Sequence, residues 1–192
     1  MATNKVLYEY GTQLLFADHA TDFGAAPATA NNSLIIGTPT DVAMNFSVIA
    51  AAAAWQSAKT ATLADTGTAW PIEWILGACM ESTATPAANG TFDFYWNASP
   101  SDTAAKGNSG GASGSDASYA IAGRFQLIPI GSLVVRANVI NIDSNIGTLV
   151  MPHLYGSLII VNNTSVAMVA DGDADECHAV LTPKIRHIQA AA

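Results

Sequence analysis

The residues best suited to chemistry in this chain form a short acidic run near its C-terminal end. Carboxylates stand at Asp171, Asp173, Asp175 and Glu176. Carboxylates at alternate positions of a loop can converge on Ca²⁺, which prefers six to eight oxygen ligands. The run departs from an EF-hand loop, because its sixth position is Glu176 instead of glycine and its twelfth is Thr182 instead of glutamate. The pattern favours a solvated acidic hairpin tip, with Ca²⁺ binding as the weaker alternative.

Histidine, cysteine and serine patterns give no sign of catalysis. The histidines at positions 19, 153, 178 and 187 contain no pair with the spacing of a helical zinc site. Cys177 and His178 are neighbours and point to opposite faces of a strand, while Cys79 lies in the middle of a strand-like run. The chain has no G-x-S-x-G nucleophile motif. We therefore expect a protein that is not an enzyme and has no cofactor, with reduced, buried thiols.

Three further carboxylates lie near aromatic residues. Glu73 and Glu81 share one face of an expected strand, and Asp93 stands on the next one. A glycosidase would need such groups to face each other across a cleft. Polar positions on the outer face of a sheet are the simpler interpretation. Tyr95, expected to be exposed beside them, offers a ring for stacking on sugar, which keeps carbohydrate binding as an alternative.

Two aromatic-rich alternating runs must position these groups. The first begins at Trp70, the second ends at Trp96, and residues 85–90 between them, TPAANG, are typical of a turn. We expect a hairpin with its large side chains on one face. The predicted core residues are Trp70, Trp74, Phe92, Phe94 and Trp96.

The rest of the chain also reads as short strands separated by turns. Alternation predicts a half-buried antiparallel strand from Asp41, with Val48 facing inward, and further strands over 55–63, 119–127, 133–139, 154–161 and 177–188. Residues 97–118 are rich in glycine and serine and predict a long surface loop. Residues 1–40 predict an extended N-terminal arm, and residues 41–192 an all-β domain. The fold class is a two-sheet antiparallel β-sandwich, and a jelly roll is its expected form.

Composition narrows the possible partners. Charged residues make up 11% of the 192 residues, and the net charge is −8 with scattered lysines and arginines. Direct nucleic-acid binding is disfavoured, because it needs clustered positive charge. The chain shows neither a secretion signal at its start nor an apolar run of membrane-spanning length. A low-charge surface suits a protein that lies against partners, and we expect synthesis in the cytoplasm with no membrane contact.

Several runs resemble jelly-roll structural proteins of tailed-bacteriophage virions. They are Trp70-Pro-Ile-Glu-Trp, Glu81 to Pro86, Asn89-Gly-Thr-Phe92, Tyr95-Trp-Asn97, Gly114-Ser-Asp116 and residues 151–162, MPHLYGSLIIVN. The resemblance covers roughly residues 55–187. Its motifs concern packing and turns, so it carries over no catalytic residue.

The resemblance implies a virion component made in the host bacterial cytoplasm. It implies a homo-oligomer, commonly a trimer, that contacts the major capsid protein or other virion proteins. The first hypothesis is a capsid decoration or cement protein that stabilises the phage head. The alternatives are a tail, collar or baseplate component, or a carbohydrate-binding host-attachment module that uses Tyr95 and the loop of residues 97–118.

Overall fold

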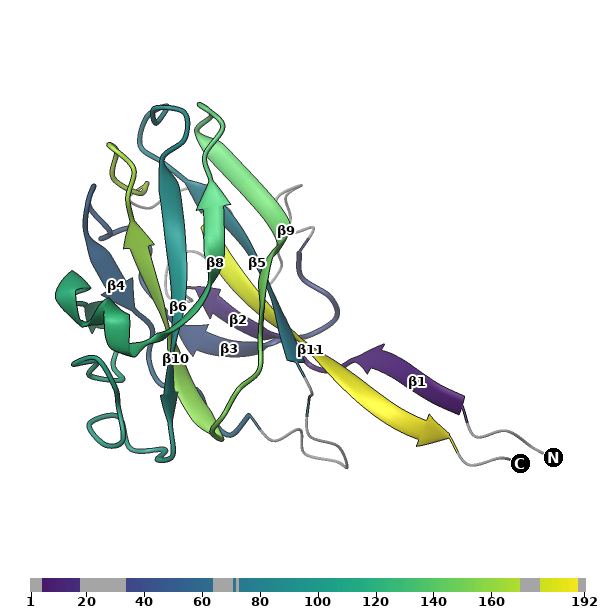
Figure 1. Ribbon diagram of the computed structural model, residues 1–192. Coiled ribbons are helices and arrows are strands. Elements are labelled where there is room, and N and C mark those ends of the chain that lie inside the picture. The colour runs from purple at the N-terminus through teal and green to yellow at the C-terminus, as the bar shows by residue number, and fades with distance from the viewer. Residues whose placement is uncertain (1–4, 18–33, 64–70, 72, 170–176, 190–192) are drawn as a thin grey trace.

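A computed structural model describes residues 5–17, 34–63, 71, 73–169 and 177–189. The six-stranded sheet has the order β3 (Thr40–Ala43), β2 (Leu14–Ala17), β11 (His178–Gln189), β5 (Glu73–Glu81) and β9 (Ile140–Leu149), with β1 (Lys5–Tyr10) also paired to β11. The five-stranded sheet has the order β7 (Ala117–Ser118), β4 (Ala54–Gln56), β10 (Tyr155–Asn162), β6 (Thr91–Ser99) and β8 (Ile128–Val134). The two sheets pack face to face (Figure 1). The expected two-sheet, largely antiparallel β-sandwich is confirmed.

The main core lies between the sheets and holds most of the predicted aromatic residues. Trp74, Phe92, Phe94 and Trp96 are at most 3% exposed and belong to one continuous apolar cluster. Phe16 meets Trp96 edge to face, with ring centroids 6.5 Å apart. Trp70, the other predicted core residue, lies outside the described residues.

The predicted hairpin is wrong, although both of its strands exist. β5 belongs to the six-stranded sheet and β6 to the five-stranded sheet, so the residues between them cross from one sheet to the other. The physical reason is the size of the apolar faces. In a hairpin these faces would lie side by side and still need a cover, whereas in opposite sheets they cover each other.

Part of the expected N-terminal arm lies inside the sandwich. β2 is fully buried and pairs with β11, so residues 14–17 belong to the domain. β1 pairs with the far half of β11, and the two strands project beyond the sandwich as a ribbon (Figure 1). Residues 18–33 of the expected arm lie outside the described residues. β3 pairs with β2 in parallel, not antiparallel as expected, because the long intervening segment 18–39 leaves the strand direction free.

Four other strand predictions need correction. The strand expected over 133–139 instead ends at Val134, because β8 covers residues 128–134. β3 ends at Ala43 and β4 covers only residues 54–56, so both strands are shorter than expected, and Val48 is 48% exposed. Residues 121–126 form a short 3₁₀ helix, η2 (Ile121–Gln126), where alternation predicted a strand. η2 packs so closely on the preceding loop that a Cβ on Gly123 would lie 1.9 Å from the Gly110 carbonyl oxygen. Tertiary packing therefore overrides the alternating pattern there.

One open side of the sandwich is closed by backbone contact between β8 and β9. A Cβ on Gly147 would lie 2.1 Å from the carbonyl oxygen of Ile130, and one on Gly131 would lie 2.3 Å from that of Ile146. The two edge strands meet at this point because neither glycine has a side chain. In the part of the chain that is described, no helix is long and apolar enough to cross a membrane.

Candidate functional site

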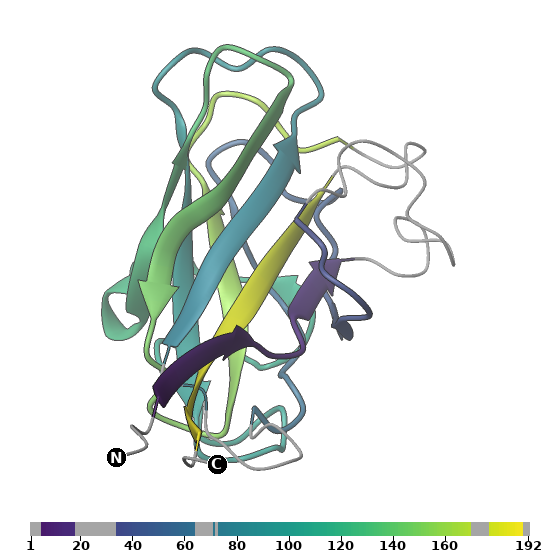
Figure 2. The same cartoon turned by 90° about the vertical axis from the view of Figure 1, so that its right-hand side faces the viewer.

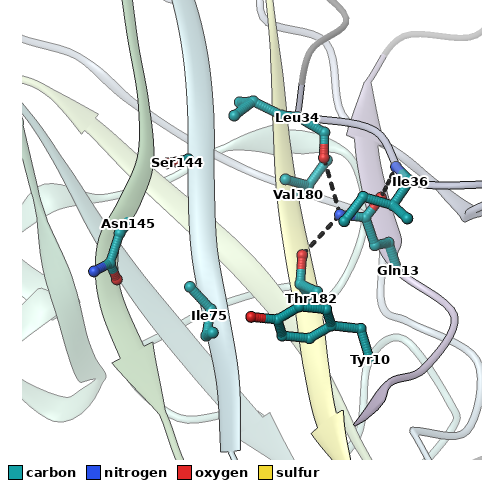
Figure 3. Close-up of a pocket in the computed structure, with 9 residues that line it drawn as sticks. All are labelled: Tyr10, Gln13, Leu34, Ile36, Ile75, Ser144, Asn145, Val180 and Thr182. Carbon is teal, nitrogen blue, oxygen red and sulfur yellow. Dashed lines mark hydrogen bonds between the residues drawn. The ribbon is translucent and has the colours of Figure 1, made fainter.

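A pocket of about 350 Å³ lies on the outer face of the six-stranded sheet, where the ribbon joins the sandwich. Figure 2 views this face, with β5, β11 and β2 side by side. The pocket is lined by residues from β1, β5, β9, β11 and two connecting segments: Tyr10, Gln13, Leu34, Ile36, Ile75, Ser144, Asn145, Val180 and Thr182 (Figure 3). Ile75, Val180 and Thr182 point outward because Leu76 and Leu181 point into the core.

Gln13 holds one wall of the pocket in place. Its side chain is 1% exposed, and its amide nitrogen donates to the Leu34 carbonyl at 2.9 Å and to the Thr182 hydroxyl at 2.7 Å. Its amide oxygen accepts from the Ile36 backbone N–H at 2.6 Å (Figure 3). A buried amide with these three bonds fixes residues 34–36 against β11. The pocket wall is therefore built before any ligand arrives.

An irregularity in β9 forms the opposite wall. β9 places residues 144–146 against the single Gly77 of β5, where the register shifts. A Cβ on Gly77 would come within 3.2 Å of the Asp143 carbonyl oxygen, so glycine lets the bulge sit close to β5. The Asn145 backbone N–H donates to the Asp143 carboxylate at 2.9 Å. Bulges re-aim side chains, and this one places Ser144 and Asn145 at the pocket.

The described lining residues are all uncharged, and an ion pair stands beside them on the same face of the sheet. Lys184 Nζ lies 2.6 Å from Glu73 Oε1 on the same outer face. The hydrogen bond to Glu73 and the nearby negative charge raise the pKa of Lys184, against a smaller opposing effect of desolvation. Lys184 Nζ also lies 5.1 Å from the ring centroid of Tyr8. Among the described residues, the side chains that line the pocket are therefore polar or apolar but not ionised.

The rim of the pocket and the adjoining ribbon carry exposed apolar side chains. Tyr10 is 61% exposed, Tyr8 is 57% exposed and Ile36 is 58% exposed. Tyr8 and Tyr10 are opposite Arg186 and Lys184 in the β1–β11 pairing, which places both tyrosines on the pocket side. Leu7, 45% exposed, alternates with them and lies on the other face of the ribbon.

Tyr95 is not the exposed platform that the sequence suggested. It is half-buried and packs on a second apolar cluster over the five-stranded sheet, formed by Ala54, Ala112, Tyr119, Leu127, Ile159 and Val161. Burial is the main cause of the raised pKa of Tyr95, and Asp93 adds to it while Arg124 opposes it. The loop of residues 100–116 and η2 cover this part of the sheet, so the Tyr95 ring is not open for a sugar to stack on.

The glycine-serine loop is fastened to the sheet by the polar side chains of Lys59, which is half-buried, and Gln56, which is buried. Lys59 Nζ donates to the Ser99 hydroxyl and to the carbonyl oxygens of Thr103 and Lys106, at 2.7–2.9 Å. Gln56 Oε1 accepts from the backbone N–H groups of residues 113 and 114. Desolvation lowers the pKa of Lys59, while Asp102 opposes the shift. The loop is thus an ordered lid over the second cluster.

The other candidate residues are not brought together. Glu73 and Glu81 lie on β5 and Asp93 on β6, and these strands belong to different sheets, so they do not face each other across a cleft. Asp93 instead accepts hydrogen bonds from Ser132 and Asn163. Both cysteines are buried and free of disulfides. Among the described residues no group of three or more histidine, cysteine, aspartate or glutamate side chains is placed to hold a metal. The acidic run of residues 171–176 lies outside the described residues.

Sequence reasoning missed the pocket because its residues come from distant segments. Tyr10 and Gln13 belong to the expected arm, and Asn145 lies in a stretch where the sequence predicts no strand. The alternation of Tyr8 and Tyr10 was the one available signal, since large aromatic residues on an expected arm need a covering surface or a ligand. In comparisons with protein-family models, curated proteins and solved structures, the chain has no match.

Proposed function

We propose that this chain is a non-enzymatic structural protein of a tailed-phage virion, a decoration or cement protein that binds the head as a homo-oligomer. The observation that best supports assembly is the β1–β11 ribbon, which projects from the sandwich (Figure 1). Among the described strands β1 pairs only with β11, so its other edge has no strand beside it. An edge strand with unpaired backbone groups is a ready surface for a neighbouring subunit.

The stability of the ribbon supports the same proposal. A two-stranded ribbon is marginally stable alone, and this one carries Leu7 on one face and Tyr8 and Tyr10 on the other. A neighbouring subunit that pairs with β1 and covers Leu7 would stabilise it. A cyclic trimer requires two different surfaces of each subunit to meet, and the ribbon edge supplies one of them.

Strand order supports a jelly-roll form for the sandwich. Without β1, β3 and β7, the strands follow the order β2-β11-β5-β9 in one sheet and β4-β10-β6-β8 in the other. Eight strands in two Greek keys make a jelly roll, a form used in viral capsid and lectin domains. Because one fold serves many functions, the ribbon and the sequence resemblance carry the assignment.

The assembly test replaces Leu7 with lysine. We expect the unmodified protein to sediment at three times its 19.8 kDa mass, and Leu7→Lys to shift it towards monomer, because charge on an edge strand blocks pairing. Val150→Lys is the matched control, because Val150 is 69% exposed and lies after β9. A monomer before mutation, or equal effects of the two variants, would refute assembly through the ribbon.

The location test measures copy number. Quantitative mass spectrometry of purified particles should find hundreds of copies per virion, spread over the head in a cryo-electron microscopy map. A few copies at one vertex would place the protein in the tail, collar or baseplate instead. Absence from particles would refute the virion assignment.

A further inference from the structure

We propose that the pocket beside the ribbon binds a neutral carbohydrate, with Tyr10 as the stacking ring and Asn145 as a hydrogen-bonding group. This inference goes beyond the proposed assembly function, because it assigns a ligand to a site on the opposite face of the ribbon from Leu7. Tyr10, Ile75 and Asn145 come from three different strands and are brought to one cavity by the sheet (Figure 3).

The absence of charge in the lining defines the first property of the ligand. An ion placed among these nine side chains would lose hydration without meeting an opposite charge. Lys184 and Glu73, on the same face, are already joined at 2.6 Å, and the Asp143 carboxylate is bonded to the backbone at Asn145. The ligand class is therefore uncharged.

The arrangement of polar and apolar atoms defines the second property. Leu34, Ile36, Ile75 and Val180 provide an apolar surface, while hydroxyl and amide groups come from Tyr10, Ser144, Asn145 and Thr182. The Thr182 hydroxyl already accepts from Gln13. A wholly apolar occupant would cover the polar groups of Tyr10, Ser144 and Asn145 without offering them hydrogen bonds. A molecule with an apolar face and a rim of hydroxyl groups satisfies both sets, which is the chemistry of a pyranose ring.

The aromatic row extends the site beyond the pocket. Tyr8 is two residues from Tyr10 on the same strand face, which separates the two rings by roughly 7 Å along the strand. Both rings are more than half exposed. Lys184 Nζ lies over the Tyr8 ring, and its ion pair with Glu73 holds it there. Two rings in a row can each stack on one unit of an oligosaccharide, whereas a single small molecule would contact only one of them.

The pocket is also rigid in the way that a binding site requires. Gln13 joins residues 34–36 by two hydrogen bonds and Thr182 of β11 by a third, and the Asp143 carboxylate fixes the backbone at Asn145. A wall that is already ordered needs little further ordering when a ligand binds. Neutral pockets with a few placed polar groups are typical of small-molecule sites.

The test is calorimetric titration of the full chain with maltohexaose, cellohexaose and chitohexaose, and with polygalacturonate as the charged probe. We expect at least one neutral hexasaccharide to bind and polygalacturonate not to bind. Tyr10→Ala should weaken binding about tenfold or more, equivalent to about 1.4 kcal/mol. Asn145→Ala should weaken it by about threefold to tenfold through the lost hydrogen bond.

Phe125→Ala is the matched control, because Phe125 is an exposed aromatic residue on η2, which packs over the other sheet. It should leave the affinity unchanged. Asn145 is exposed, so its variant stays informative if Tyr10→Ala fails to fold. The proposal is overturned if no neutral oligosaccharide binds at millimolar concentration, or if the Tyr10 and Asn145 variants bind as well as the unmodified chain. It is also overturned if Tyr10→Ala changes only the sedimentation mass, because the pocket then belongs to a subunit interface.

Discussion

At the scale of single residues, glycine occurs in this sandwich where a neighbouring side chain or backbone lies too close to leave room for a Cβ atom. Gly156 on β10 lies beside the indole of Trp96, and a Cβ there would be 2.2 Å from Trp96 Cζ2 and 2.7 Å from the Asn97 carbonyl oxygen. Trp96 is fully buried against Phe16 and has no room to withdraw. Glycine at position 156 is thus part of the packing of the core.

We therefore expect Gly156→Ala to lower the free energy of unfolding by about 1–3 kcal/mol, the usual cost of overpacking. Urea denaturation followed by far-ultraviolet circular dichroism measures the change. In the Trp96→Leu background the same substitution should cost less, because the smaller side chain leaves space for the new methyl group. Equal costs in both backgrounds would show that contact with Trp96 is not the cause.

At the scale of elements, the long loop after β6 is held by hydrogen bonds from residues that lie far from it in the sequence or on the neighbouring strand. Lys59 follows β4, yet its ammonium group bonds to Ser99 and to the loop carbonyls of Thr103 and Lys106. Asn97 Oδ1 accepts from the Ser109 N–H at 2.9 Å. These bonds keep the loop over Tyr119 and Ile159, so that the outer face of the five-stranded sheet stays covered.

Lys59→Met should release this loop while the sandwich stays folded. It keeps an apolar side chain of similar length but removes three charge-assisted hydrogen bonds, so amide hydrogen exchange in residues 100–116 should accelerate on the order of tenfold. Lys106→Met is the matched control, because its exposed side chain is dispensable while its carbonyl remains. Unchanged exchange in Lys59→Met would show that other contacts hold the loop.

At the scale of the whole molecule, both sheets share one core and should unfold together. Trp74 on β5 belongs to the same apolar cluster as Phe92 and Phe94 on β6. β8 and β9 also meet at Gly131 and Gly147, which links the sheets along one side. A shared core is the usual basis of a cooperative transition.

Trp74→Ala should lower the free energy of unfolding by about 3–5 kcal/mol, because it leaves a large cavity in this core. Urea curves measured by circular dichroism and by tryptophan fluorescence should coincide. Trp74→Phe should cost much less, since it keeps an aromatic ring and removes an indole N–H that has no hydrogen-bond partner among the described residues. Separate transitions for the two probes would show that the sheets are independent units.

The sequence by itself determined the all-β class, the two sheets and the inward faces of the main strands. In a strand with one buried face, apolar side chains stand at every second position. Trp74 and Phe94 could therefore be placed in a core from the local pattern alone. Only the tertiary structure decided which strands pair. Local pattern does not say whether β5 meets β6 in one sheet or across two, because both choices bury the same side chains.

The pocket likewise depends on tertiary structure. Tyr10, Gln13, Asn145 and Thr182 are far apart in the chain, and pairing of β11 with β1, β2 and β5, together with the bulge of β9, brings them together. Long-range pairing leaves little trace in a local window of sequence. The residues proposed here to bind a ligand were therefore not recognisable before the fold was known.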